Sequence, residues 1–591
     1  MIHIRDHQTG YLFDPWGYLG PKRKKLLSES WAGLFREEIL FALPVNKFAS
    51  FFTEDFGRPT KELYAALGSL IIQQMHDLTD EETVSHFSFN IQWHYALDIP
   101  GESDASKYLS LKTLWKLRNL VMREKLDVEL FNQTTEALAR AFKVDTTKQR
   151  IDSVHIRSNM RRLGRIGIFS QSIHTFLVNL KRRHPDVFET IDKELVNRYL
   201  SEKALSCFSL VKPTESGKTL EGVARDLFAL VRLFEKNDDV QSLHSYNTLL
   251  RVLKDQCRVT EAKDNQTEAV EVIPPKEVPS DSLQNPSDPG AGYSGHKGQG
   301  YQAQVMETYC DSKDESLRAK TLNLITHVEV ESASIGDVHA LIPALESTRE
   351  RDLAPVEVLA DSLYGSDDNC ERARKMGVDV ISPTMGTPNE KTLSLADFQQ
   401  SAKGIITACP QGHTPVRVTA SKKQKHGVAF ASEHCNLCPL RGQCPVRTGK
   451  NDNYLYYDIK AIRIAKRRAM EYSPEFKDKY RWRSGIEATF SAMDKTTGVK
   501  RLKVRGLSAV SYFARLKAIA VNIFRATSVR NALTPTSKTL ATVKSGLVSA
   551  KFYVLDTIYV FKEQFGETLG LLATIFTPAK NEPHYELKIA A

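Results

Sequence analysis

The succession of strand and helix patterns between residues 150 and 381 constrains the fold more than any other feature of this chain. Short apolar runs predict strands and a 3.6-residue periodicity predicts helices. The predicted strands are 150–156, 301–309, 322–330, 356–360 and 378–381, and the predicted helices are 337–345 and 367–376. This order of strand, strand, strand, helix, strand, helix, strand predicts an α/β layer with a mixed sheet, interrupted by insertions.

Helical periodicity dominates the chain before this region, and other patterns follow it. At 591 residues the chain is long enough for several domains. The predicted organisation is a helical domain at 1–148, a first part of the α/β core at 149–383, an insertion at 384–472, a long helix with the basic end of the core at 473–530, and a helical extension at 531–591. Within the second part, about 165–295 is expected to be a helical insertion followed by an exposed linker.

Composition excludes several classes of protein. Hydrophobic residues make up 41% and charged residues 26%, as in ordinary globular proteins rather than disordered or multispan membrane proteins. The first residues lack an apolar signal core, so we expect no secretion. Eight cysteines fit a reducing cytoplasm. The apolar run 552–576 is interrupted by charges and is not expected to span a membrane.

Positive charge is concentrated in one window. The whole chain has a formal charge of +10, whereas residues 459–530 hold 18 Lys or Arg against 5 Asp or Glu, which is +13. Such a region favours a polyanionic partner, with nucleic acid the first choice. A solvated helix surface is an equally good reading of charge alone.

Three carboxylates stand in contexts that suit metal binding. Asp152 lies inside a predicted strand, Asp361 ends another, and Glu487 lies in a predicted helix. A buried acid needs a partner, and three carboxylates can hold two Mg²⁺ ions roughly 4 Å apart, one activating the attacking oxygen and one stabilising the leaving oxygen. Taken singly, each acid is more simply a turn cap or a solvated side chain.

The helix around Glu487 is the most specific of these segments. Tyr480, Arg483 and Glu487 are spaced to share one helix face. Arg483 could clamp a phosphate in a bidentate manner, although an ordinary Arg–Glu helix pair is the alternative. Downstream, the basic residues Arg501, Lys503 and Arg505 are further candidates for reading phosphates.

These motifs resemble a known family. Tyr480-x2-Arg483-x3-Glu487 followed by Lys495 resembles the Y-R-E-K signature of DDE insertion-sequence transposases, and the segments that begin at Asp152 and Asp361 resemble the other two motifs of that class. The layout is most similar to the insertion sequence eleven-eighty-two type. The spacing between Glu487 and Lys495 is one residue longer than in the signature, which turns Lys495 about 100° further round an ideal helix.

The resemblance implies an RNase H-like catalytic core and Mg²⁺-dependent chemistry, with Mn²⁺ as an alternative ion. Asp152, Asp361 and Glu487 would then be the catalytic metal ligands. Tyr480, Arg483 and Lys495 would contact the DNA end. The implied partners are double-stranded DNA, as terminal inverted repeats and as target, and a second copy of the chain in a homodimeric synaptic complex. No membrane is involved, and the implied location is the cytoplasm, at the bacterial nucleoid.

A cysteine cluster lies between the second and third acids. Cys409, Cys435, Cys438 and Cys444 would make a tetrahedral structural Zn²⁺ site in a small zinc-ribbon-like insertion. His413 could replace Cys409, and a set of metal-free thiols is the alternative.

The leading hypothesis is a DNA transposase that cleaves insertion-sequence ends and transfers the strands into target DNA. A metal-dependent nuclease of the same fold and a non-catalytic or decayed zinc-bearing DNA-binding protein are the alternatives.

Overall fold

A computed structural model describes residues 2–534, except 8, 10, 55, 56, 58, 203, 204, 206, 207, 209, 210, 261–268, 388–391 and 421–424. By its contacts the chain divides into residues 1–528 and residues 529–591. The predicted extension at 531–591, including the apolar run 552–576, therefore lies outside the described residues except for 531–534.

Helices fill the first 141 residues, as their periodicity predicts. Helix α5 begins with a capping box: the Thr79 side chain accepts the Glu82 amide, and the Glu82 side chain accepts the Thr79 amide. The helices are α1 (Gly20–Ser28), α2 (Trp31–Leu34), α3 (Val45–Ala49), α4 (Leu63–Met75), α5 (Asp80–Phe89), α6 (Ile91–Ala96), α7 (Asp104–Lys107), α8 (Leu111–Arg123) and α9 (Leu126–Ala141), with short turns η1 (Gly17–Leu19), η2 (Phe35–Ile39) and η3 (Leu40–Ala42).

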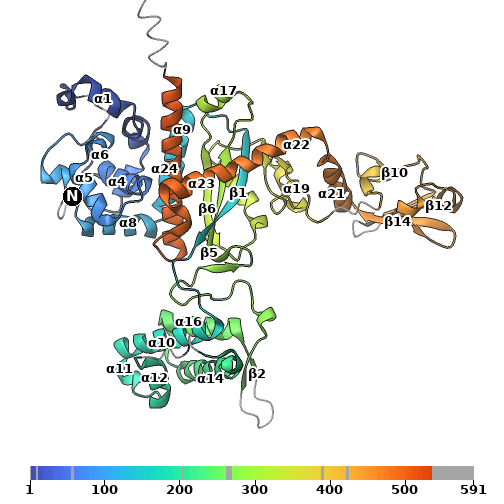
Figure 1. The fold of residues 1–591 in the computed structure, drawn as a ribbon, viewed down its shortest axis with the longest axis horizontal. Helices are drawn as coiled ribbons and strands as arrows, with labels where there is room; N and C mark the ends of the chain where they lie inside the picture. The colour runs from blue at the N-terminus through green and yellow to red at the C-terminus, as the bar shows by residue number, and fades with distance from the viewer. Residues whose placement is uncertain are drawn as a thin grey trace, which may run out of the picture. The chain divides into compact units, whose positions relative to one another are not determined.

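A six-stranded mixed sheet follows, and its strands are the predicted ones with one short strand added (Figure 1). The strands are β1 (Lys148–Arg157), β4 (Gly292–Ser294), β5 (Gly298–Thr308), β6 (Ile325–Ser332), β7 (Glu357–Leu359) and β8 (Asp379–Ile381). Their order is β4-β5-β1-β7-β8, and β6 pairs with β5 on the edge opposite β1. Strand β1 is antiparallel to β5 and parallel to β7, which is parallel to β8.

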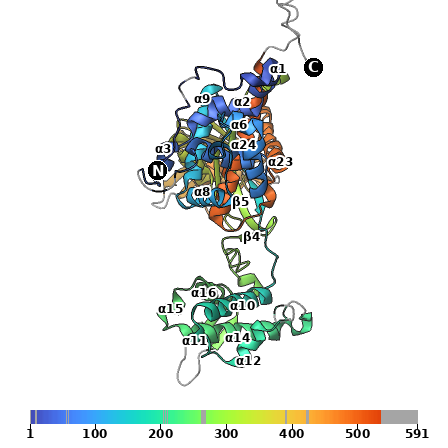
Figure 2. The ribbon, with the colours of Figure 1, turned by 90° about the vertical axis from the view of Figure 1, so that its left-hand side faces the viewer.

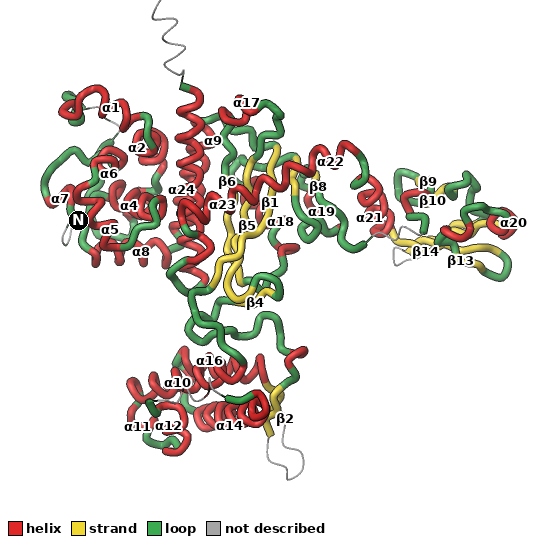
Figure 3. The backbone as a smooth tube through the Cα atoms, viewed as in Figure 1, coloured by secondary structure: helices red, strands yellow, loops and turns green. Residues whose placement is uncertain are grey.

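Helices cover both faces of this sheet (Figure 3). On one face, Ile151, Val358 and Ala360 pack on α18 (Leu341–Arg349) and α19 (Asp367–Lys375). On the other, Leu359 and Ile381 pack near aromatic residues of α22 (Pro474–Tyr480) and η9 (Arg481–Ser484). The remaining elements of the core are α17 (Glu315–Lys320), η6 (Asp337–His339), α23 (Gly485–Thr497), η10 (Val499–Arg501) and α24 (Leu507–Leu533).

Helix α24 is apolar because it is a core helix. Among the described residues it is the one helix long and apolar enough to cross a membrane, yet 72% of its most apolar 18-residue window is buried inside the protein. Its polar side chains join other elements: Arg515 pairs with Asp127 of α9 at 2.6 Å and with Glu329 of β6 at 2.7 Å.

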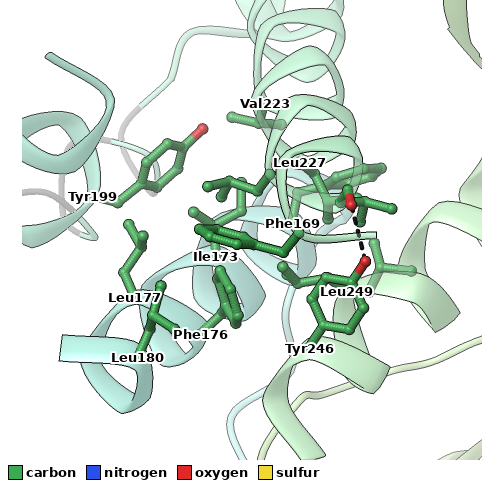
Figure 4. Close-up of a cluster of buried hydrophobic side chains, with 14 of the residues drawn as sticks. Phe169, Ile173, Phe176, Leu177, Leu180, Tyr199, Val223, Leu227, Tyr246 and Leu249 are labelled. Atoms are coloured by element: carbon green, nitrogen blue, oxygen red, sulfur yellow. Dashed lines mark hydrogen bonds between the residues drawn. The ribbon is translucent and has the colours of Figure 1, made fainter. Parts of the chain in front are cut away.

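A helical insertion separates β1 from β4 and has its own core. Its elements are α10 (Arg165–Arg183), α11 (Pro185–Phe188), α12 (Lys193–Leu200), η4 (Pro213–Glu215), α14 (Ser216–Phe234), α15 (Asp238–Gln241), α16 (His244–Gln256) and the hairpin β2 (Cys257–Thr260) and β3 (Ala269–Val272), seen in Figure 2. Phe169, Ile173, Phe176 and Leu227 lie together in its centre (Figure 4). There Tyr246 donates to the Val231 carbonyl oxygen at 2.9 Å.

The prediction of an exposed linker before β4 is wrong for the second half of that segment. Beyond β3, Leu283, Asn285 and Asp288 are buried. Asp288 accepts hydrogen bonds from the Ser158 hydroxyl, the Tyr301 hydroxyl and the Gly506 amide, at 2.5 to 2.9 Å. Polar composition suggested exposure, but a buried carboxylate is tolerated where donors satisfy it.

The cysteine-bearing insertion contains a small antiparallel sheet of order β11-β12-β14-β13. Its elements are η7 (Leu395–Asp397), β9 (Gln399–Gln400), β10 (Ile406–Ala408), β11 (Arg417–Ala420), β12 (Lys425–Ala431), α20 (Ser432–Asn436), η8 (Arg441–Gln443), β13 (Arg447–Thr448) and β14 (Asp452–Asp458), followed by α21 (Ile459–Met470). One face of this sheet is apolar, with Val428, Phe430 and Leu455 in a core that Cys409, Cys435 and Cys444 also contact.

Candidate active site

Asp152 lies on β1, and Asp361 lies at the same level just beyond the end of the neighbouring parallel strand β7, where its carboxylate accepts the Leu363 amide at 2.8 Å. In the β1–β7 register Arg150 is opposite Leu359. Asp152 and Asp361 are each two residues further along, and a two-residue step keeps the same face of a sheet. Both carboxylates therefore lie on the face that carries α22 and η9, where the parallel strands end.

The environment of Asp152 holds an excess of negative charge. Its carboxylate pairs with Arg483 at 2.6 Å and accepts the Ser153 amide at 2.9 Å. Burial raises the pKa of Asp152 to about 6, Arg483 opposes the rise, and the charges of Asp361 and Asp337 add to it. A cation beside Asp152 and Asp361 would offset this repulsion, so this donor pair suits a divalent ion.

The single helix predicted from Ser473 to about residue 496 is wrong in its middle. Ser473 caps the first turn as predicted, with its hydroxyl accepting the Phe476 amide at 3.1 Å. The chain then tightens into η9 before α23 begins at Gly485. Arg150 donates to the freed Trp482 carbonyl oxygen at 2.6 Å, and a Cβ on Gly485 would lie 2.2 Å from the Arg150 Nη1 atom. A larger residue at this position would therefore displace the Arg150 guanidinium.

A buried carboxylate joins α23 to the sheet. Glu307 of β5 is fully buried and accepts from Arg150 at 2.8 Å, Arg525 at 2.8 Å and the Thr489 hydroxyl at 2.8 Å. Burial opposes ionisation of Glu307, but Arg525, Arg150 and the Thr489 hydrogen bond outweigh it and lower its pKa. We call these four residues the Glu307 brace. Sequence reasoning missed it, and its one signal was an acid in an apolar strand.

Arg483 contacts Asp152, Tyr480 lies near enough for the charges of both acids to act on it, and Glu487 does not touch them. Tyr480 is half-buried and stacks on Phe476 with ring centroids 5.4 Å apart. Burial raises the pKa of Tyr480, Arg483 opposes this, and the charges of Asp361 and Asp152 add to it. Glu487 is exposed one turn beyond Arg483. Within the described part of the chain, its side chain has no hydrogen-bond or ion-pair partner.

Apart from Arg483, the basic residues predicted to contact DNA are exposed. Lys495 lies near the end of α23, which stops at Gly498 as predicted. Arg501, Lys503 and Arg505 follow it. Two further groups border the acid pair: Lys297 donates to the Ser153 hydroxyl at 3.0 Å, and Asp337 accepts from Gln304 at 2.8 Å. Nothing in the sequence pattern singled out Asp337.

The four cysteines of the insertion gather without bonding to one another. Cys409, Cys435, Cys438 and Cys444 are free thiols and line a cavity of about 30 Å³ together with His413 and His434. Burial raises the pKa of Cys444, and the neighbouring Cys438 and Cys409 add to the rise. Four clustered thiols are a donor set that suits Zn²⁺. Even so, among the described residues no group of three or more His, Cys, Asp or Glu is arranged to hold a metal ion.

A comparison with known families identifies one region. Residues 408–527 match the family described as a transposase DDE domain. The match includes the cysteine cluster, Arg483, Glu487 and most of α24, and it supports a DDE transposase with an RNase H-like fold and DNA as partner. No protein of curated description matches the chain.

Proposed function

We propose that this chain is a DNA transposase that cleaves insertion-sequence ends and transfers the freed strands into target DNA. The observation that carries the proposal is that Asp361 follows the end of β7 at the level of Asp152 on the adjacent parallel strand β1, close enough for the two charges to interact, with α22 and α23 on the same face. The family match over 408–527 supports the same class. The insertion sequence eleven-eighty-two type remains our assignment from the layout of the chain.

Asp152, Asp361 and Glu487 are the proposed ligands of Mg²⁺, or of Mn²⁺. Bound metal would supply Lewis-acid polarisation of the scissile phosphodiester. Glu487 is the third ligand in this proposal because it follows Arg483 by one helical turn on α23. Asp152 and Asp361 bring negative charge that a cation offsets.

Arg483 exchanges partners in this proposal. Without DNA its guanidinium neutralises Asp152. When a phosphodiester enters, Arg483 binds the phosphate instead, because its planar fork matches a phosphate as well as a carboxylate. Tyr480, Lys495, Arg501, Lys503 and Arg505 hold the DNA end alongside it.

The other parts have supporting roles. The N-terminal helical domain recognises the terminal inverted repeats, and two copies of the chain bring two ends together at the nucleoid. Zn²⁺ bound by Cys409, Cys435, Cys438 and Cys444 would brace the insertion, since clustered free thiols around a small cavity suit that ion.

The test is a joining reaction between labelled element-end DNA and a target plasmid. Asp152→Asn, Asp361→Asn and Glu487→Gln should each abolish cleavage and joining while duplex binding persists. Asp379→Asn is the matched control, because Asp379 is an exposed acid at the opposite end of the same parallel strands. Cleavage without joining would favour the nuclease. Unchanged DNA functions in all three variants would favour a non-catalytic DNA-binding protein.

A further inference from the structure

The outer face of the small sheet in the cysteine-bearing insertion carries two tyrosines that no core covers. Inward-pointing Leu455 and Tyr457 of β14 are buried, so the alternation of the strand turns Tyr454 and Tyr456 outward. Tyr456 is 70% exposed. A single exposed aromatic residue is ordinary, whereas adjoining ones that form a patch indicate an interaction site.

The two rings are nearly parallel. Their planes differ by 11° and their centroids are 6.4 Å apart. A Cβ on Gly427 would lie 3.0 Å from the Tyr456 ring, and one on Gly449 would lie 2.4 Å from the Tyr454 ring. Glycines therefore let both rings rest against the backbone of neighbouring segments. The exposed Tyr456 ring and the half-buried Tyr454 ring form an aromatic platform on β14, the strand labelled in Figure 1. The Arg417 guanidinium lies over the Tyr454 ring, 5.8 Å from its centroid.

Basic side chains surround this platform. Arg447 is opposite Tyr454 in the β13–β14 register, so it shares the outward face. Arg417 bonds the Tyr454 hydroxyl at 3.2 Å and pairs with Asp452 at 3.1 Å. Arg447 and Lys450 are exposed, and neither has an acidic partner among the described residues. Residues 399–458 hold 8 Lys or Arg against 3 Asp or Glu.

We propose that this face, defined by Tyr454, Tyr456, Arg447 and Lys450, binds single-stranded DNA by stacking unpaired bases on the two rings. Aromatic platforms with flanking cations are how proteins hold single strands, because every base has a π-face and every nucleotide a phosphate. We call it the tyrosine face.

The ring spacing favours unpaired over paired DNA. Successive bases of a B-form strand are about 3.4 Å apart, whereas the rings are 6.4 Å apart. Two bases resting on both rings must therefore be unstacked from each other. A duplex also hides the faces of its internal bases, so it would meet only the basic residues.

Binding of a fluorescent 20-nucleotide oligo(dT) and of a 20-base-pair duplex to the full chain tests this proposal. Anisotropy is measured without added Mg²⁺ or Mn²⁺ and without a chelator, so that the result does not depend on metal-dependent catalysis and any Zn²⁺ in the insertion stays bound. Tyr456→Ala should weaken oligo(dT) binding about tenfold and leave duplex binding within twofold. Tyr456→Phe, which keeps the ring, should bind oligo(dT) as the wild type does. Tyr18→Ala removes a tyrosine that is 65% exposed in the N-terminal domain and should change neither affinity.

A crosslinking readout locates the contact directly. An oligonucleotide with iododeoxyuridine, irradiated in the complex, should label Tyr454 or Tyr456. Equal oligo(dT) affinity of the wild type and Tyr456→Ala, or labelling only outside residues 447–457, would overturn the proposal. So would a loss of self-association in Tyr456→Ala without a change in oligo(dT) binding, because the face would then be a contact between two copies of the chain.

Discussion

Removing the centre of the Glu307 brace should loosen α23 selectively. In Glu307→Ala the Arg150 guanidinium, only 7% exposed, loses its carboxylate, while Arg525, 23% exposed, can recover some solvent. Breaking a buried pair costs about 3–5 kcal/mol, and the partial exposure of Arg525 favours the lower end. A loss of about 3 kcal/mol corresponds to roughly a hundredfold change in an opening equilibrium.

Hydrogen exchange read by mass spectrometry measures this opening. Peptides covering the first turns of α23 should lose about a hundredfold in protection in Glu307→Ala. Peptides of the helical insertion should be unchanged, because that bundle has a separate core. Glu307→Gln, which keeps the side-chain volume, should lose protection in the same region and so separates loss of charge from loss of packing.

Glu329→Ala is the matched control. Its carboxylate is 54% exposed and also pairs with an arginine, Arg515, which keeps Asp127 as a partner. An exposed pair is worth at most about 1 kcal/mol, so protection should fall less than about fivefold. Equal protection of α23 in Glu307→Ala and Glu329→Ala, or a uniform loss over the whole chain, would refute the role of the brace.

Three other outcomes follow from the described groups. Burial, with Arg351 and Arg515 nearby, lowers the pKa of His327 to about 3. In the unfolded chain the His327 imidazole binds a proton near pH 6.5, whereas in the folded chain it stays neutral. The stability present above pH 6.5 is therefore lost as the pH falls toward 3. Between pH 7 and 5 the free energy of unfolding of the wild type should therefore fall about 2 kcal/mol more than that of His327→Gln, and parallel pH profiles in urea titrations would contradict this assignment. Metal analysis of purified protein should find about one Zn per chain, reduced in Cys435→Ser; a metal-free wild type with freely reactive thiols would reject the zinc proposal. Arg501→Ala, Lys503→Ala and Arg505→Ala should each weaken duplex binding and lower the slope of log affinity against log salt by about 1, whereas Arg182→Ala in the helical insertion should leave that slope unchanged.

Local patterns predicted the parts of the fold that depend on local physics. Hydrophobic periodicity and helix-ending residues correctly predicted the strands next to Asp152 and Asp361 and the helix that stops before Gly377. The same holds for the Ser473 cap and the Gly498 stop. Each of these depends on residues within a turn or a strand length, which a sequence displays directly.

Burial and pairing across long separations could not be read in the same way. The pattern at 301–309 predicted a strand, but not that β5 is buried on both faces from Gly300 onward. The break between α22 and α23 depends on an arginine 332 residues earlier in the chain. The brace depends on a glutamate 157 residues from that arginine.

The sequence by itself determined which segments become strands and helices, and which acids, cations and thiols they carry. Only the tertiary structure decided that Asp152 and Asp361 lie at the same level and that Arg483, rather than Glu487, contacts Asp152. It also decided that Tyr454 and Tyr456 face outward together. The physical reason is that register and burial are set by packing between segments hundreds of residues apart. The composition of each segment leaves those relations open.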